Sequence, residues 1–122
     1  MALLLGKVLV IEAEGASGWE EFRKAVADKL EKLRFHSFRL TSRVKGIENF
    51  EWKPAHPKPW NVESAEWVEL SRSLQVGTII VGEFTLFGYV EEDFMDHFDR
   101  IADVFGEAIE DAFQVCHRKF VT

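Results

Sequence analysis

The segment from Glu91 to Phe120 constrains this chain most, because it combines a helical period with charge on one side. Its apolar residues recur at alternating three- and four-residue steps, which is the period of one face of an α-helix. This apolar stripe consists of Phe94, Phe98, Ile101, Phe105, Ala108, Ala112 and Val115. Five further residues make it wider than a two-stranded coiled coil needs: Met95, Ala102, Ile109, Phe113 and Cys116. The pattern therefore predicts a long amphipathic helix packed on the chain's own sheet.

The opposite side of this segment carries a row of carboxylates, the acidic stripe: Asp96, Asp99, Asp103, Glu107 and Glu110. Residues 91–122 hold nine acidic and three basic side chains and so carry the whole net charge of −6. The helix dipole favours acids only in the first turn, and like charges four residues apart destabilise a helix by roughly 0.2–0.5 kcal/mol per pair. We therefore interpret the acidic stripe as a recognition surface for a basic protein partner, strongest at low salt.

A second charged surface is predicted between Phe35 and Lys45, where apolar and polar residues alternate. Phe38, Leu40 and Val44 point to one side, and Arg39, Arg43 and Lys45 point to the other. This alternation is typical of a half-buried strand with a basic outer face. Two interpretations of this face stay open. In one, the basic face meets the acidic stripe, either within one chain or across a symmetric homodimer. The alternative is an ordinary surface of mixed charge.

The rest of the chain predicts further elements. The apolar run Val8–Ile11, within Leu3–Glu14, is typical of a buried strand. Ser17 and Glu20 form a capping box that opens a helix. A short strand is expected around Phe50–Lys53, followed by a loop with all three prolines, and a long strand at Thr78–Val90, with Gly82 and Gly88 at bulges or bends. Asn61–Gln75 fits a helix capped by Asn61, or a strand in which Val68, Leu70 and Leu74 share a face.

These elements predict a single α+β domain over residues 1–122. Their order is β-α-β-β-α-β-α, which suits an antiparallel sheet arranged as a ferredoxin-like plait with an added long carboxy-terminal helix. If Asn61–Gln75 is a strand, the expected fold is a curved five-stranded antiparallel sheet packed on the carboxy-terminal helix.

Composition excludes several classes of protein. No apolar run is long enough to span a membrane, and the first residues lack the basic region of a secretory signal. The single cysteine, Cys116, suits a reducing cytoplasm. The net negative charge makes nucleic acid an unlikely partner. We find no catalytic, cofactor or metal motif, and we expect no cofactor.

The sequence therefore predicts a small, cytoplasmic, non-enzymatic interaction module of the adaptor, chaperone, immunity-protein or inhibitor type. Its acidic helix would bind a basic protein partner, and the chain would form a homodimer. The alternative is a small-molecule binder or enzyme with an aromatic pocket between the sheet and the last helix, near Glu83, His36 or Trp67.

Overall fold

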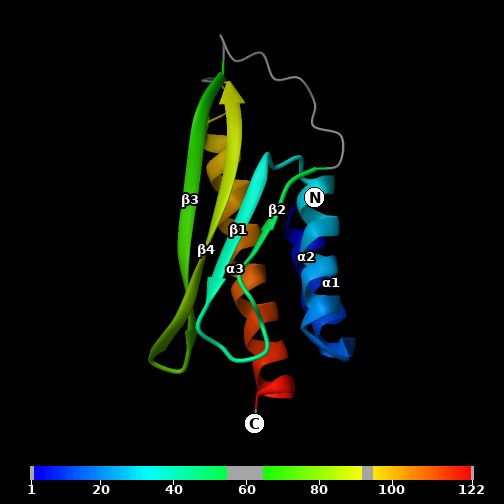
Figure 1. The fold of residues 1–122 in the computed structure, drawn as a ribbon. Coiled ribbons are helices and arrows are strands. Elements are labelled where there is room, and N and C mark those ends of the chain that lie inside the picture. The colour runs from blue at the N-terminus through cyan, green and yellow to red at the C-terminus, as the bar shows by residue number, and fades with distance from the viewer. Residues whose placement is uncertain (1, 55–64, 92–94, 122) are drawn as a thin grey trace.

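The computed structural model describes residues 2–54, 65–91 and 95–121, without the side chains of 65, 91, 95 and 96. Three helices and four strands follow one another in these residues (Figure 1). They are α1 (Ala2–Gly15), α2 (Trp19–Lys32), β1 (Ser37–Ser42), β2 (Phe50–Trp52), β3 (Ala65–Val76), β4 (Ile79–Glu91) and α3 (Met95–Phe120). The predicted α+β class, the antiparallel sheet and the long carboxy-terminal helix are confirmed.

The four strands form one antiparallel sheet in the order β2-β1-β4-β3. Leu40 of β1 lies opposite Phe84 of β4, and Leu70 of β3 lies opposite Leu86. Because opposite residues share a face, these side chains point to the helices, and their neighbours in each strand point outward. We call these two sides the inner and the outer face of the sheet.

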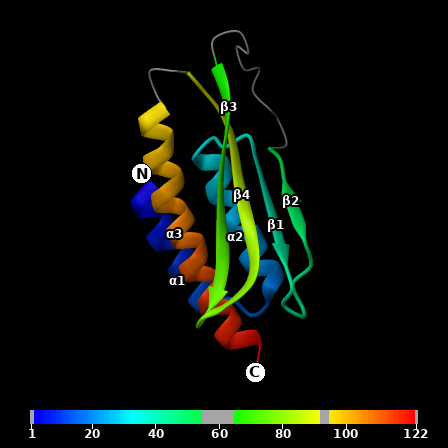
Figure 2. The same ribbon diagram turned by 90° about the vertical axis from the view of Figure 1, so that its left-hand side faces the viewer.

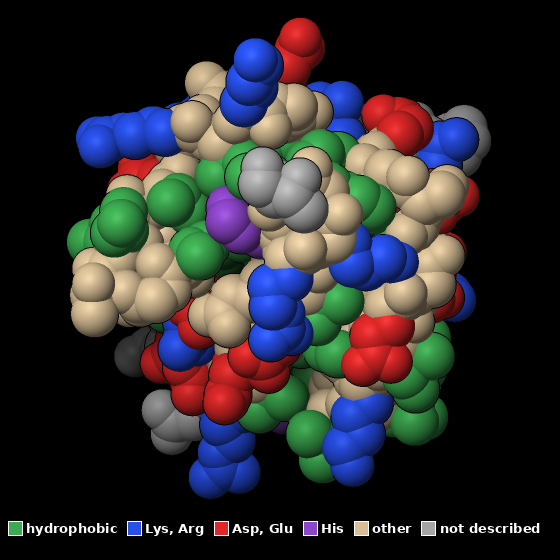
Figure 3. All heavy atoms as spheres, turned by 90° about the horizontal axis from the view of Figure 1, so that it is seen from below, with side chains coloured by type: hydrophobic (Ala, Val, Ile, Leu, Met, Phe, Trp, Pro, Cys, Tyr) green, Lys and Arg blue, Asp and Glu red, His purple; other side chains and the backbone are tan. Residues whose placement is uncertain are grey.

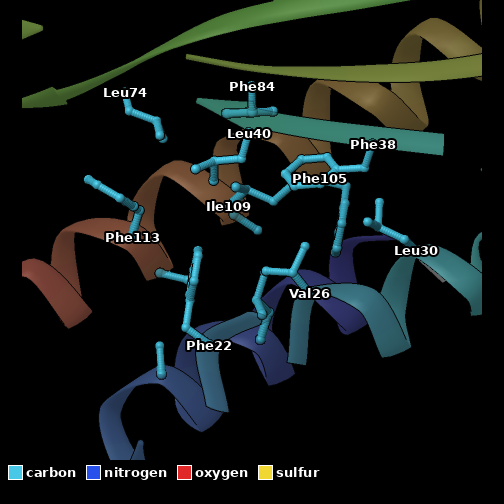
Figure 4. Close-up of a cluster of buried hydrophobic side chains, with 14 of the residues drawn as sticks. Phe22, Val26, Leu30, Phe38, Leu40, Leu74, Phe84, Phe105, Ile109 and Phe113 are labelled. Atoms are coloured by element: carbon cyan, nitrogen blue, oxygen red, sulfur yellow. The ribbon is translucent and has the colours of Figure 1, made fainter. Parts of the chain in front are cut away.

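All three helices lie on the inner side of the sheet, and α1 is the outermost because it packs against α3 and α2 (Figure 2). Between the sheet and the helices lies a closely packed core of side chains from α2, α3 and the inner face (Figure 4). It includes Phe22, Val26, Leu30, Phe38, Leu40, Leu74, Phe84, Phe105, Ile109 and Phe113. In the described residues the apolar stripe of α3 therefore packs within its own chain, as its width predicted, while Phe94 and the Met95 side chain lie outside them.

The predicted strand at Leu3–Glu14 is wrong, because this segment forms helix α1. Its inward residues are Ala2, Leu5, Gly6, Leu9 and Ala13, which are spaced as on one helix face. The exposed residues Leu3, Leu4 and Ile11 are apolar as well. A helix that is apolar on both sides looks like a continuous hydrophobic run, and such a run does not distinguish a strand from a helix.

The preferred helix at Asn61–Gln75 is also wrong, because Ala65–Val76 forms strand β3, and 61–64 lie outside the described residues. The strand alternative is confirmed, with Leu70 and Leu74 turned inward. Pairing with β4 along the whole length of β3 overrides its helical spacing. The observed order is thus α-α-β-β-β-β-α instead of β-α-β-β-α-β-α, and the sheet has four strands in the described residues.

Of two local predictions, the one for the glycines of β4 is confirmed only at Gly82, and the one for the start of α2 is wrong. A register shift lies between Leu74 and Gln75, next to Gly82, where a side-chain Cβ would lie 2.3 Å from the Thr41 carbonyl oxygen. Gly88 lies opposite Val68 in regular register, so the pairing shows no bulge there. The capping box predicted for Ser17 and Glu20 is wrong, because the N-cap of α2 is Gly18, which makes no side-chain hydrogen bond. Instead the Ser17 amide donates to Glu21 Oε2 at 2.6 Å. This hydrogen bond is the main cause that lowers the pKa of the Glu21 carboxyl.

Candidate protein-interaction surface on helices α1 and α3

The structure places the acidic stripe on the side of α3 that faces away from the core. Asp99, Asp103 and Glu107 are exposed and Glu110 is half-buried. Asp96 belongs to the first turn of α3, and its side chain lies outside the described part of the structure. The predicted helix thus presents its carboxylates to solvent, except where β3 approaches.

Arg72 of β3 neutralises two of these carboxylates. Its Nη1 donates to Asp103 Oδ1 at 2.8 Å and to the Asp103 carbonyl oxygen at 3.0 Å. Its Nε donates to Glu110 Oε1 at 3.1 Å. Asp103 and Glu110 lie seven residues apart, which is about two helical turns, so one guanidinium bridges both turns. The bridge passes over Gly106, where a Cβ would lie 2.9 Å from Arg72 Cδ.

This bridge was not predicted from the sequence, because a helix was preferred at 61–75, and such a helix gives no reason for Arg72 to contact α3. Alternation of residues 68, 70, 72 and 74 was the available signal, since it places Arg72 on the inner face. Among the described residues, Asp99 and Glu107 have no ion-pair partner. Within the described part of the acidic stripe, these two carboxylates therefore carry the unpaired negative charge.

Glu107 borders a groove between α1 and α3, which we call the α1–α3 groove. It has a volume of about 530 Å³ and is lined by Leu3, Gly6, Lys7, Val10, Ile11, Val104, Glu107 and Ala108. Leu3 and Ile11 are 60% and 65% exposed. An apolar helix face is normally covered, and exposed apolar patches often mark interaction sites. The groove therefore combines an apolar surface with one carboxylate and one cation.

Polar contacts join the carboxyl-terminal half of α1, one wall of the groove, to α2 and α3. The buried ammonium of Lys29 in α2 forms an ion pair with Glu12 of α1. The Lys119 ammonium of α3 donates to backbone carbonyl oxygens at the end of α1, among them that of Glu14 at 2.6 Å. Lysine near a helix carboxyl end complements the helix dipole there. These contacts anchor the carboxyl-terminal half of α1.

The basic face predicted for Phe35–Lys45 is present, but one chain does not bring it to the acidic stripe. Arg39 lies on the outer face of β1, and its Nε donates to Glu51 Oε1 at 3.2 Å. Arg43 and Lys45 are exposed beyond the end of β1. Helix α3 lies on the other side of the sheet (Figure 1). A contact between the two surfaces across a dimer stays a prediction.

The alternative aromatic pocket was expected between the sheet and α3, and the core side chains of Figure 4 fill that space. The residues named for it lie elsewhere: Trp67 and Glu83 are on the outer face, where the His36 ring is 4.9 Å from that of Trp67.

The single cysteine and the metal-ligating residue types form no further site in the described residues. Cys116 lies in the core, and its burial raises the pKa of its thiol to about 11. Among the described residues, no three His, Cys, Asp or Glu side chains gather as metal ligands.

The charge of α3 changes sign along its length. Its carboxylates end at Asp111, and its last turn holds His117, Arg118 and Lys119. Viewed from the end of the molecule where the chain finishes, acidic and basic side chains are interspersed with hydrophobic ones (Figure 3).

Within the described residues, no helix has both the length and the hydropathy to cross a membrane. Comparison with protein-family models, with curated proteins and with solved structures found no match for this chain.

Proposed function

We propose that this chain is a non-enzymatic, cytoplasmic interaction module that binds a basic amphipathic helix of a partner protein. The α1–α3 groove is the observation that carries the proposal. It offers exposed apolar side chains along the pair of helices α1 and α3, and the carboxylate of Glu107 borders it. A helix that lays its apolar face in a groove is a common mode of peptide recognition.

The two parts of this surface have different roles in binding. Leu3, Val10 and Ile11 would supply affinity, because full burial of such a side chain contributes roughly 1.5–3 kcal/mol. The carboxylates of Asp99 and Glu107 would attract basic residues of the partner and raise the association rate. Lys7, the cation of the groove, would disfavour a basic residue at its own position and so select one orientation of the helix.

A fluorescent Leu/Lys peptide tests the proposal, since its helix has leucines on one face and lysines on the other. Fluorescence anisotropy should show that it binds, and that binding weakens as salt is added. A Leu/Glu peptide of the same pattern should bind at least roughly tenfold more weakly, because like charges meet.

Variants of exposed residues locate the site. Leu3→Ser combined with Ile11→Ser should weaken binding of the Leu/Lys peptide about tenfold or more. Glu107→Lys should weaken it as well. Glu31→Lys, at an exposed position of α2, is the matched control with the same change in net charge. Equal losses for Glu107→Lys and Glu31→Lys, or no loss in the Leu3/Ile11 variant, would reject the groove as the binding site.

A further inference from the structure

A cluster of aromatic side chains lies on the outer face of the sheet, away from the α1–α3 groove. The Trp67 ring of β3 stacks on Phe87 of β4, with ring centroids 5.4 Å apart and planes at 28°. Tyr89 meets Trp67 edge-on at 4.8 Å, and so does His36 at 4.9 Å. Trp67 is nevertheless 42% exposed. The outer face thus presents an indole that is fixed by its neighbours and open to solvent.

Cross-strand stabilisation explains only part of this cluster. Trp67 and Tyr89 lie directly opposite each other, and an aromatic pair in this position stabilises a sheet by roughly 0.2–1 kcal/mol. It does not explain why cations gather beside the rings. The Arg39 guanidinium lies over the Phe87 ring, 5.6 Å from its centroid. Lys53 is exposed and has no ion-pair partner among the residues described.

These side chains enclose a shallow groove of about 210 Å³, which we call the outer groove. Its lining includes His36, Arg39, Glu51, Lys53, Trp67 and Phe87. Arg39 uses its Nε on Glu51, and a guanidinium has five N–H donors, so its terminal nitrogens keep donors for a ligand. The lining holds the cations Arg39 and Lys53 and the carboxylate of Glu51, and Glu69 borders it, because its Oε1 accepts a hydrogen bond from Trp67 Nε1 at 3.2 Å. The available donors of Arg39 and Lys53, and not a net positive charge, therefore suit the outer groove to an anion.

We propose that the outer groove binds a mononucleotide. Its base would stack on the exposed indole of Trp67, which Phe87 supports from beneath, since aromatic side chains stack on every nucleobase. Its phosphate would accept hydrogen bonds from Arg39 and Lys53, whose charges suit a phosphate group. The small volume favours one nucleotide, and the net negative charge of the protein disfavours a long polyanion.

Titration with adenosine monophosphate, followed by amide NMR spectra of the full chain, tests this proposal. We expect shifts confined to β1, β3 and β4 around Arg39, Trp67 and Phe87. Adenosine, which has no phosphate, should bind at least roughly tenfold more weakly, and so should inorganic phosphate. A short oligothymidylate should bind more weakly than the mononucleotide. Tighter binding of the oligothymidylate would overturn the proposal in favour of single-stranded nucleic acid.

Two variants give independent checks. Arg39→Met should reduce affinity for adenosine monophosphate roughly tenfold, while Arg43→Met removes an exposed cation outside the outer groove and should leave it unchanged. Trp67→Leu should abolish the stacking contribution, with the thermal midpoint measured to confirm that it folds. The proposal fails if adenosine binds as well as its monophosphate, if no resonance shifts at millimolar ligand, or if both arginine variants behave alike. It does not depend on the peptide-binding groove, which lies across the sheet.

Discussion

At the scale of single residues, the fold depends on a few polar side chains that link elements far apart in sequence. Arg72 joins β3 to α3, Lys29 joins α2 to α1, and Lys119 joins α3 to the end of α1. Each makes a charge-assisted contact, which is stronger than a neutral hydrogen bond. Their effect on stability depends on how far each one is shielded from water.

Replacement of Arg72 by Met should lower the free energy of unfolding by about 1–2 kcal/mol. Hydrogen bonds to charged groups contribute about 1.5–3 kcal/mol, and the exposure of Asp103 reduces this value. The matched change Arg39→Met removes one hydrogen bond between two side chains that are more than half exposed, so about 0.5 kcal/mol or less is expected. Urea unfolding measures both. Equal effects would show that the Arg72 bridge adds no more than a surface ion pair.

Cys116 gives stability a defined dependence on pH. Its thiol has a pKa of about 11 in the folded chain, raised from 9.0 by burial, with Lys119 acting in the opposite direction. A raised pKa stabilises the fold fully below pH 9, and this contribution is lost as the pH rises toward 11. Cys116→Ala has no such group, so the stability difference between the two proteins should be constant near neutrality and should change only above pH 9. A constant difference up to pH 11 would contradict the buried, neutral thiol.

At the scale of elements, the sequence predicted the helices and strands whose pattern of apolar residues fits only one kind of secondary structure. The seven-residue rhythm of α3 and the alternation of β1 are unambiguous, so both were predicted within a few residues. Helix α1 was not predicted, because apolar residues lie on its exposed side as well as on its buried side. Strand β3 was not, because Trp67, Leu70 and Leu74 also fit a helix face.

The wrong predictions for α1 and β3 also limited what the sequence could predict about the candidate sites. The carboxylates of α3 could be named from the sequence, since they require only that α3 is a helix. The α1–α3 groove needs α1 to be a helix beside α3, and the Arg72 bridge needs β3 to be a strand. The outer groove needs the register of three strands, which sets Trp67 beside Phe87. Such contacts between distant segments have no local signal in one sequence.

The packing of α1 on α3 can be tested at Gly6. A Cβ at this position would lie 2.8 Å from the Cβ of Ala108. Gly6→Ala gains about 1 kcal/mol in helix propensity, but overpacking costs about 1–3 kcal/mol. We therefore expect a net loss of up to about 2 kcal/mol in the free energy of unfolding. The double variant Gly6→Ala with Ala108→Gly should lose less free energy of unfolding than the sum of the losses in the two single variants. Additive effects in urea unfolding would show that the helices are not in close contact there.

At the scale of the whole molecule, the charge is arranged as two separated surfaces. The free carboxylates of Asp99 and Glu107 lie on the helical side, and the exposed cations Arg39, Arg43 and Lys45 belong to β1 and the segment that follows it. One chain does not bring the two together, so a contact between them requires a second copy of the chain. A two-fold contact would place each surface against its counterpart and form two equal interfaces.

The predicted homodimer should therefore depend on salt. The Debye length falls from about 30 Å at 0.01 M to about 3 Å at 1 M ionic strength, so sedimentation should show association at low salt that weakens as salt rises. Asp99→Lys should abolish this association, while Glu31→Lys, which changes the net charge equally, should not. Leu3→Ser and Ile11→Ser should leave it unchanged, which separates it from the apolar α1–α3 groove. A monomer at every ionic strength, or a dimer that salt does not weaken, would mean that the two charged surfaces do not meet, and the α3 carboxylates would then be left for a heterologous partner.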